Sequence, residues 1–168
     1  DPSVRRLENR LSVNCNTGLS LAAGDLVCFL ADDDYYYPTW FEKAVKHFQE
    51  NPAHRAAFGR LVYSYSPVMG FSPNPDPKSI RWYPGVVKEP AGKLDHNQVV
   101  HRNFAPSYRW PTAIGTLAGP DAVYFSEIAR QHLFYPIDAY ACVKRLHPKS
   151  LLESQQTYIG GSMEGLRE

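Results

Sequence analysis

A short apolar run that ends in three adjacent carboxylates constrains the fold of this chain more than any other feature. Residues 26–31 (Leu-Val-Cys-Phe-Leu-Ala) have the length of a strand and are apolar throughout, which is typical of a strand buried on both faces in a mostly parallel sheet. Asp32, Asp33 and Asp34 follow directly. Open α/β sheets place their ligand crevices at the carboxyl ends of strands, so the sequence predicts a functional site at this turn.

The segments around this run alternate between helical and extended patterns. Apolar residues at helical spacing predict a helix over about residues 5–23, broken near Gly18, and a second helix from Pro38 to residue 50. The same spacing predicts a third helix over residues 121–132. Further strands are predicted where β-forming residues cluster, over residues 57–65, 98–102 and 133–137. We therefore expect an α/β fold in which helices flank a mostly parallel sheet.

Two segments lack such periodicity. Residues 66–92 are rich in proline and predict a long loop, and a loop of this length is usually functional or mobile. Residues 153–168 are polar and predict a frayed tail. We therefore expect a single domain over residues 1–152 and a polar C-terminal tail over residues 153–168.

The charge balance and the cysteines limit the possible partners and compartment. The 168 residues carry 18 Lys and Arg against 17 Asp and Glu, so there is no basic surplus for nucleic acid or an anionic membrane. No apolar run approaches the roughly 20 residues of a membrane-spanning helix, and the first residues lack the layout of a signal peptide. Cys15, Cys28 and Cys142 fit neither a disulfide framework nor a zinc site. We expect a cytoplasmic protein whose cysteines are small buried hydrophobes.

The three adjacent carboxylates allow two interpretations. Neighbouring carboxylates repel one another, and a hard divalent cation relieves that repulsion. The spacing is too tight for an EF-hand loop, so the cation would be shared with a substrate phosphate, which suits Mg²⁺ or Mn²⁺. The alternative is a solvated acidic turn that caps the helix at Pro38. Residue types alone do not separate the two.

Other polar residues are equally ambiguous on their own. Asp121 is either an N-cap or a general base, because it stands at the start of a helix after Gly119-Pro120. Asp95, His96 and His101 flank a short strand as structural groups or ligands, and Arg10 is a surface residue or a phosphate clamp. Several aromatic residues fit either a sugar-stacking surface or the core: Tyr35, Tyr36, Tyr37, Trp40, Trp82, Tyr83 and Trp110.

Two segments together resemble the central signature of family 2 glycosyltransferases with the GT-A fold. They are residues 16–25 (Asn-Thr-Gly-Leu-Ser-Leu-Ala-Ala-Gly-Asp) and residues 29–38 (Phe-Leu-Ala-Asp-Asp-Asp-Tyr-Tyr-Tyr-Pro). Three later segments, 94–102, 121–125 and 134–138, resemble more narrowly the spore-coat polysaccharide glycosyltransferases of that family. The resemblance covers residues 10–138. It implies a GT-A-like mixed, mostly parallel sheet and metal-dependent inverting transfer of a sugar. The process that the resemblance suggests is surface or spore-coat polysaccharide synthesis.

The resemblance implies a donor side built on the acidic turn. Asp32 would lie near the nucleotide ribose and Asp33 would hold Mg²⁺ or Mn²⁺, whereas Asp34 takes a position that need not be acidic. Arg10 falls where the family has a diphosphate-binding arginine. The donor would be a nucleoside-diphosphate sugar of the UDP or dTDP type.

The resemblance also implies an acceptor side. Asp95 and His96 would line it, and Asp121 would be the catalytic base that takes the proton of a carbohydrate hydroxyl. Many family members carry an acidic residue where this chain has Ala31, and a Glu-Asp pair where it has Pro120-Asp121. The spore-coat pattern therefore fits better than the general one.

Family members begin with a strand-helix-strand unit that cups the nucleotide base, and here the resemblance begins only near Arg10. We therefore expect the N-terminal part of the GT-A domain to be missing from the 168 residues, so that residues 1–152 form a partial catalytic domain. Two other functions stay open, a nucleotidyltransferase and a catalytically silent carbohydrate-binding or scaffold domain. A homo-oligomer is a further partner expectation.

Overall fold

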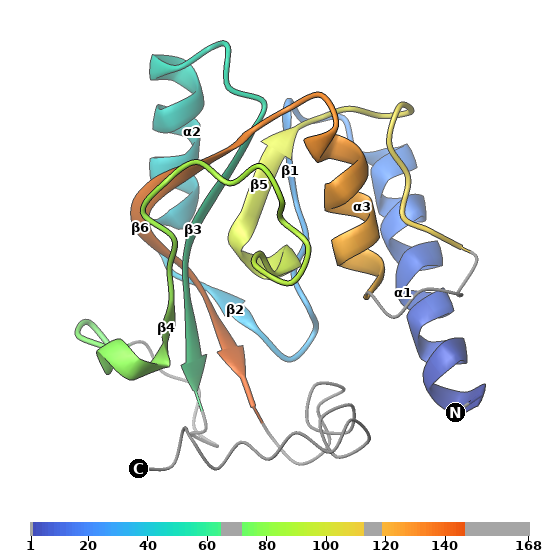
Figure 1. Ribbon diagram of the computed structural model, residues 1–168, viewed down its shortest axis with the longest axis horizontal. Helices are drawn as coiled ribbons and strands as arrows, with labels where there is room; N and C mark the ends of the chain where they lie inside the picture. The colour runs from blue at the N-terminus through green and yellow to red at the C-terminus, as the bar shows by residue number, and fades with distance from the viewer. Residues whose placement is uncertain (1, 65–71, 113–118, 147–168) are drawn as a thin grey trace.

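The sheet of this protein lies between helices on both of its faces. The computed structural model describes residues 2–64, 72–112 and 119–146. Helix α2 (Trp40–Glu50) covers one face, and helices α1 (Pro2–Leu21) and α3 (Pro120–Ala129) lie together on the other (Figure 1). The expected mixture of helices and strands is therefore confirmed for the described residues.

Six strands form one mixed sheet with β3 at its centre. Their bounds are β1 Leu26–Cys28, β2 Tyr35–Tyr36, β3 Ala56–Ser64, β4 Ile80–Arg81, β5 Val99–Arg102 and β6 Phe134–Arg145. The order is β1-β5-β3-β6-β2, and β4 pairs with β3 off this path. Among the described pairs, β3 with β6 is parallel and the other four are antiparallel. The prediction of a mostly parallel sheet is therefore wrong.

Burial on both faces explains why the apolar pattern gave the wrong strand direction. In β3, Ala56 and Phe58 pack on the side of α1 and α3, whereas Ala57 and Leu61 pack against α2. Helices on both faces demand apolar side chains at successive positions, and that demand is the same for parallel and antiparallel neighbours. A continuous apolar run thus reports the two helical layers and not the direction of the neighbouring strand.

Strand β1 is shorter and less buried than the apolar run at residues 26–31 predicts. It spans only Leu26–Cys28 and pairs on one side, with β5, so it is an edge strand within the described sheet. Val27 is buried, but its two neighbours are half-buried, and Leu30 is 46% exposed. The second half of the run has left the sheet and leads into the acidic turn.

The other predicted elements are present with shifted ends. Helix α1 continues through Gly18 without a break, and α2 begins at Trp40, two residues after Pro38. The described part of the predicted proline-rich loop contains a short 3₁₀ turn, η1 (Pro77–Ser79), and strand β4. The predicted tail over residues 153–168 and the domain boundary before it lie outside the described residues.

Strand β6 differs most from its prediction. Instead of residues 133–137 it covers the 12 residues Phe134–Arg145, and it runs parallel to β3 along that strand's whole length, up to the pair Ser64 and Arg145. The pairing carries the last two residues of β6, Lys144 and Arg145, toward the acidic turn.

The core accounts for several aromatic residues that could have been sugar-stacking groups. Trp40 and Trp110 are fully buried, and Tyr37 is also buried. Gly59 makes room for Trp40: a Cβ atom at residue 59 would lie 2.7 Å from Trp40 Cζ3 and 2.8 Å from Ala141 Cβ. Trp82 and Tyr83 are half-buried and pack against the core from its edge.

The three cysteines are free, as predicted. Cys142 is buried, and Cys15 and Cys28 are half-buried. Burial raises the pKa of all three thiols. None of the helices in the described ranges combines the length and the apolar character that crossing a membrane requires.

His101 of β5 is completely buried and has both ring nitrogens bonded. Its Nδ1 lies 2.6 Å from the carbonyl oxygen of Arg102, and its Nε2 lies 3.1 Å from the hydroxyl of Tyr124. A carbonyl only accepts, so Nδ1 carries the proton and Nε2 accepts from Tyr124. Burial lowers the pKa of His101 to about 4, so the ring is neutral in the folded protein.

We predict that His101 makes the stability of the fold sensitive to mild acid. The unfolded chain takes up a proton at the ordinary histidine pKa near 6.5, whereas the folded chain resists protonation until about pH 4. Stability is therefore present above about pH 6.5 and is lost as pH falls toward 4, by up to about 1.4 kcal/mol per pH unit. In urea unfolding, His101→Phe should be less stable than the natural chain at pH 7, yet lose less stability between pH 6.5 and 4.5. Equal losses in the two proteins would contradict the assignment.

Candidate active site

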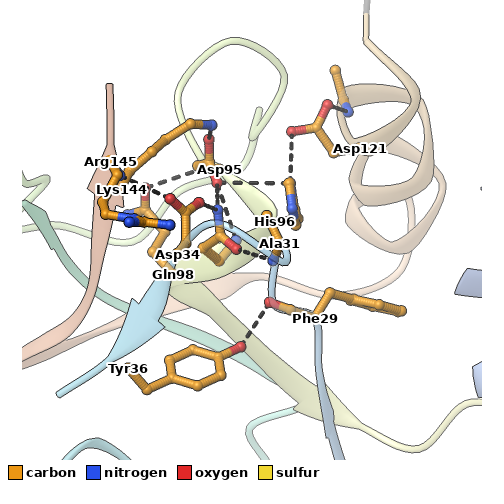
Figure 2. A network of polar contacts seen from close by, with 12 residues as sticks. Phe29, Ala31, Asp34, Tyr36, Asp95, His96, Gln98, Asp121, Lys144 and Arg145 are labelled. Carbon is orange, nitrogen blue, oxygen red and sulfur yellow. Dashed lines mark hydrogen bonds and ion pairs between the residues drawn. The ribbon is translucent and has the colours of Figure 1, made fainter. Parts of the chain in front are cut away.

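Four elements bring polar side chains to one end of the sheet (Figure 2). They are the turn between β1 and β2, the 3₁₀ turn η2 (His96–Gln98) with its cap Asp95, the first turn of α3, and the end of β6. Figure 2 shows Asp121 reaching toward His96 from α3, with Lys144 and Arg145 on the opposite side of Asp95. Contacting groups are as many as 112 residues apart in the sequence, and the fold joins them.

The acidic turn presents its three carboxylates differently. The backbone N–H of Asp34 donates to the carbonyl of Ala31 over 3.2 Å, which closes a tight turn around Asp32 and Asp33. Asp32 is exposed and Asp33 is half-buried, whereas Asp34 is only 8% exposed. Two of the three carboxylates therefore lie where a ligand reaches them, and the third belongs to the interior.

Asn97 of η2 fixes this turn. Its Oδ1 accepts from the backbone N–H of Ala31 at 2.9 Å, and its Nδ2 donates to Asp34 Oδ2 and to Asp95 Oδ1, both at 2.8 Å. The residue is completely buried, so water does not compete for these bonds. One carboxamide thus joins the acidic turn to the segment that carries Asp95 and His96.

Asp95 is a buried charge with a partner on each oxygen. Oδ1 accepts from the backbone and side chain of Asn97, and Oδ2 pairs with the ammonium of Lys144. Gln98 completes a capping box, because its Oε1 accepts from the Asp95 N–H at 3.2 Å while its Nε2 donates to the Gly59 carbonyl. Burial alone would raise the pKa of Asp95, but His96, Lys144 and the hydrogen bonds lower it to about 2.

In Asp34, unlike Asp95, the effect of burial on the pKa outweighs the effect of the hydrogen bonds. Burial is the largest influence and raises its pKa to about 6, while the backbone N–H of Arg145, at 2.8 Å from Oδ1, opposes the rise. The neighbouring charge of Asp33 raises the pKa further. Asp34 acts as a hydrogen-bond acceptor that ties the turn to β6.

His96 lies between the carboxylates of Asp95 and Asp121. Its Nδ1 is 3.7 Å from Asp95 Oδ1 and 3.8 Å from Asp121 Oδ2. Burial opposes protonation of the ring, but the two carboxylates prevail and raise its pKa. The other nitrogen, Nε2, is buried and has no hydrogen-bond partner within the described ranges. It can donate to a ligand, because an orphaned buried N–H is costly to leave unpaired.

Asp121 is in the first turn of α3 and is not its cap. Gly119 occupies the N-cap position, so the N-cap interpretation of Asp121 is wrong. Oδ1 accepts from the backbone N–H of Ala122 at 2.9 Å, at the positive end of the α3 dipole. A Cβ at residue 119 would lie 2.8 Å from that oxygen, so glycine leaves the carboxylate the space it occupies.

Two groups of ligand atoms suit a cation. The carboxylate oxygens of the exposed Asp32 and the half-buried Asp33 are hard donors of the kind Mg²⁺ and Mn²⁺ prefer. The second group is Asp95, His96 and Asp121, whose ligand atoms all lie within 4.8 Å of one another. In that group both oxygens of Asp95 are already engaged, by Asn97 and by Lys144.

The structure brings most of the predicted site residues together, with one exception. Arg10 is exposed on α1 and takes no part in the hydrogen-bonded network of Figure 2. Sequence reasoning missed Asn97, Lys144 and Arg145. The spacing of Asp95 and Gln98, which is that of a capping box, pointed to an ordered turn around Asn97, and the β-forming residues 140–143 pointed to a longer β6.

We predict that the carboxamide of Asn97 is needed for the turn to hold its shape. Asn97→Asp keeps the size of the side chain but places a third acceptor against Asp34 and Asp95, so both donated bonds become repulsive contacts. We expect a loss of about 3 kcal/mol at pH 7, in line with buried groups left unsatisfied. The loss should shrink at pH 5, where Asp34, whose pKa is about 6, takes up a proton and one of the repulsive contacts is relieved.

Urea unfolding of the variant at both pH values tests this prediction. Asn51→Asp is a matched control, because the side-chain amide of Asn51 also donates a hydrogen bond, to the carbonyl of His47, but at the end of α2 and away from the site. A loss for Asn97→Asp no larger than the control's, or one that does not change with pH, would contradict the role.

Comparison with known proteins agrees with this arrangement. No curated protein matches the chain. Residues 2–129 match the sequence profile described as Glycosyl transferase family 2, which is more than three quarters of the 168 residues and includes the acidic turn, η2 and Asp121. The chain therefore belongs to glycosyl transferase family 2, a family of GT-A-fold enzymes that transfer a sugar from a nucleotide-sugar donor to an acceptor.

Proposed function

We propose that this enzyme is a metal-dependent, inverting glycosyltransferase whose donor site is the acidic turn and whose base is Asp121. One observation carries the proposal: a continuous set of contacts links the turn to Asp121. It runs from Asp34 through Asn97 and Asp95 to His96, and from His96 to Asp121. Donor and acceptor chemistry need such a fixed separation, because the acceptor must attack as the leaving group departs.

Asp33 and Asp32 form the donor side in this proposal. The residues present fit a divalent cation, because their accessible carboxylates are hard oxygen donors at a tight turn with Asp34 tied back into the interior. Asp33 would hold Mg²⁺ or Mn²⁺ and Asp32 would bind the ribose hydroxyls. When bound, the cation neutralises charge that develops on the leaving diphosphate.

Asp121 performs the proton transfer. The acceptor hydroxyl oxygen forms a bond to the anomeric carbon while the bond from that carbon to the diphosphate oxygen breaks. Asp121 takes the hydroxyl proton, and the nucleoside diphosphate leaves with the bonding electrons from the opposite face of the sugar. The N–H of Ala122 holds the carboxylate in position before the reaction. Such a base contributes about 10²–10⁴-fold in rate.

His96 supports the acceptor side. It lies beside Asp121 with a raised pKa, and its Nε2, which has no partner among the described residues, offers a donor to an acceptor hydroxyl. Asp95 acts through its neighbours, because both of its oxygens are bonded by Asn97 and Lys144.

We propose a UDP or dTDP sugar as donor, a carbohydrate as acceptor, and a cytoplasmic role in surface or spore-coat polysaccharide synthesis.

Removal of the Asp33 carboxylate should abolish metal-dependent nucleotide binding. Calorimetric titration with UDP and dTDP, with and without Mn²⁺, should show binding that requires the metal and that Asp33→Ala loses. Asp25→Ala is the matched control, because Asp25 is exposed just before β1 and outside the turn. Metal-dependent binding that survives in Asp33→Ala would remove Asp33 from the cation site.

Asp121→Asn should separate chemistry from binding. The amide keeps the oxygen that accepts from Ala122 but no longer takes a proton, so turnover should fall by at least about 100-fold. Nucleoside diphosphate release from a panel of UDP and dTDP sugars measures turnover, and Mn²⁺–UDP titration should give an unchanged affinity. Near-normal turnover of the variant would exclude Asp121 as the base.

The same panel distinguishes the competing functions. Release of pyrophosphate instead of a nucleoside diphosphate would identify a nucleotidyltransferase. Carbohydrate binding without any metal-dependent release would identify a catalytically silent domain.

A further inference from the structure

We propose that Arg145, the last residue of β6, binds the diphosphate of the donor. The inference rests on the proposed function and adds to it the cationic side chain that receives the leaving group. Neither the resemblance nor the family match gave this residue a role, since β6 was predicted to end before it and the matched residues stop at 129.

Two contacts hold Arg145 against the acidic turn. Its backbone N–H donates to Asp34 Oδ1 at 2.8 Å, and its side-chain Nε donates to the backbone carbonyl of Asp33. The guanidinium therefore lies directly beside the residue proposed to hold the cation. Parallel pairing with Ser64 of β3 fixes the strand that delivers it.

Lys144 and Arg145 differ in what remains available for a ligand. The ammonium of Lys144 is committed to Asp95, and its side chain is only 17% exposed. Arg145 is half-buried and uses Nε on the turn, so its two terminal nitrogens stay without a hydrogen-bond partner among the described residues. A guanidinium offers five N–H donors, and its planar fork matches two phosphate oxygens at once.

The charges around the turn require such a group. Asn97 joins Asp34 to Asp95, and Asp32 and Asp33 precede Asp34 in the same turn; Lys144 and Arg145 contact this acidic set. A diphosphate adds further negative charge next to this acidic set. A divalent cation on Asp33 offsets part of it, and a fixed guanidinium offsets more where charge develops on the leaving group.

Arg145 is better placed than Arg10 for the diphosphate-binding role that the resemblance gave to Arg10. Arg10 is exposed on α1 and is absent from the network, whereas Arg145 contacts two residues of the acidic turn. If Arg145 binds the diphosphate, substitution of Arg145 lowers the affinity for UDP and pyrophosphate and substitution of Arg10 does not. One titration experiment therefore distinguishes the two arginines.

The experiment is calorimetric titration of the whole chain with UDP and with inorganic pyrophosphate, each in saturating Mn²⁺. We expect Arg145→Gln to weaken both affinities by at least about tenfold, which is the worth of one charge-assisted hydrogen bond. Arg145→Lys should recover part of the affinity because it restores the charge without the fork. Arg130→Gln is the control, because Arg130 is exposed at the end of α3 and pairs with Glu127.

Binding of Mn²⁺ alone, followed by electron paramagnetic resonance, separates a phosphate contact from a structural role. If Arg145 contacts phosphate, Arg145→Gln keeps the Mn²⁺ affinity of the natural chain while it loses affinity for pyrophosphate. An equal loss of Mn²⁺ affinity would overturn the inference, since it would show that Arg145 only shapes the turn.

Unchanged pyrophosphate and UDP affinities in Arg145→Gln, or a loss confined to Arg10→Gln, would also overturn it. If the natural chain binds neither ligand in Mn²⁺, the proposed function itself fails. That failure is distinct, because it does not depend on any variant.

Discussion

The parallel pairing of β3 and β6 is the constraint on which the rest of this structure depends. β3 occupies the centre of the sheet and presents alternate residues to two helical layers, so its position fixes α2 on one face and α1 with α3 on the other. β6 follows β3 to the pair Ser64 and Arg145. Without that full-length pairing, Lys144 and Arg145 would not reach the acidic turn, and the carboxylate of Asp95 would lack its cation.

The second organising interaction is the charge balance around Asn97. Buried carboxylates are costly unless hydrogen bonds and opposite charges surround them. Asp95 meets this condition through Asn97 and Lys144, and Asp34 meets it through Asn97 and the backbone N–H of Arg145. These two carboxylates are buried, whereas Asp32 is exposed and Asp33 and Asp121 are half-buried, so the last three are the ones a ligand can approach. The protein thus separates carboxylates that build the site from carboxylates that are available for chemistry.

The sequence predicted the location of the site better than its construction. The apolar run at residues 26–31 and the carboxylates behind it pointed to the end of the sheet where the polar network lies, and the resemblance pointed to the family that the profile match shows. The predicted direction of the strands was wrong, because apolar residues indicate that a strand is buried but not whether its neighbour runs parallel or antiparallel to it. Asp34 was expected in a position that need not be acidic, yet its carboxylate accepts from Asn97 and Arg145.

Hydrogen bonds between residues far apart in the sequence could not be predicted from local sequence patterns. Asn97 and Asp34 are 63 residues apart, and Arg145 and Asp34 are 111 residues apart. Polar residues of these types are ordinary on a surface, and nothing in their immediate neighbours distinguishes a buried bridge from a solvated side chain. Arg10 is the opposite case. Its position in the sequence matches a diphosphate-binding arginine of the family, but in the structure it is exposed on α1 and lies outside the network.

The central claim is that the acidic turn, and not the neighbouring Asp95–His96–Asp121 group, holds the catalytic cation. The most direct test is a crystal structure of the chain with Mn²⁺ and UDP, with data collected at the manganese absorption edge. We expect one anomalous peak within coordination distance of the Asp33 carboxylate and of a diphosphate oxygen. A peak coordinated by His96 and Asp121 with none at Asp33 would contradict it.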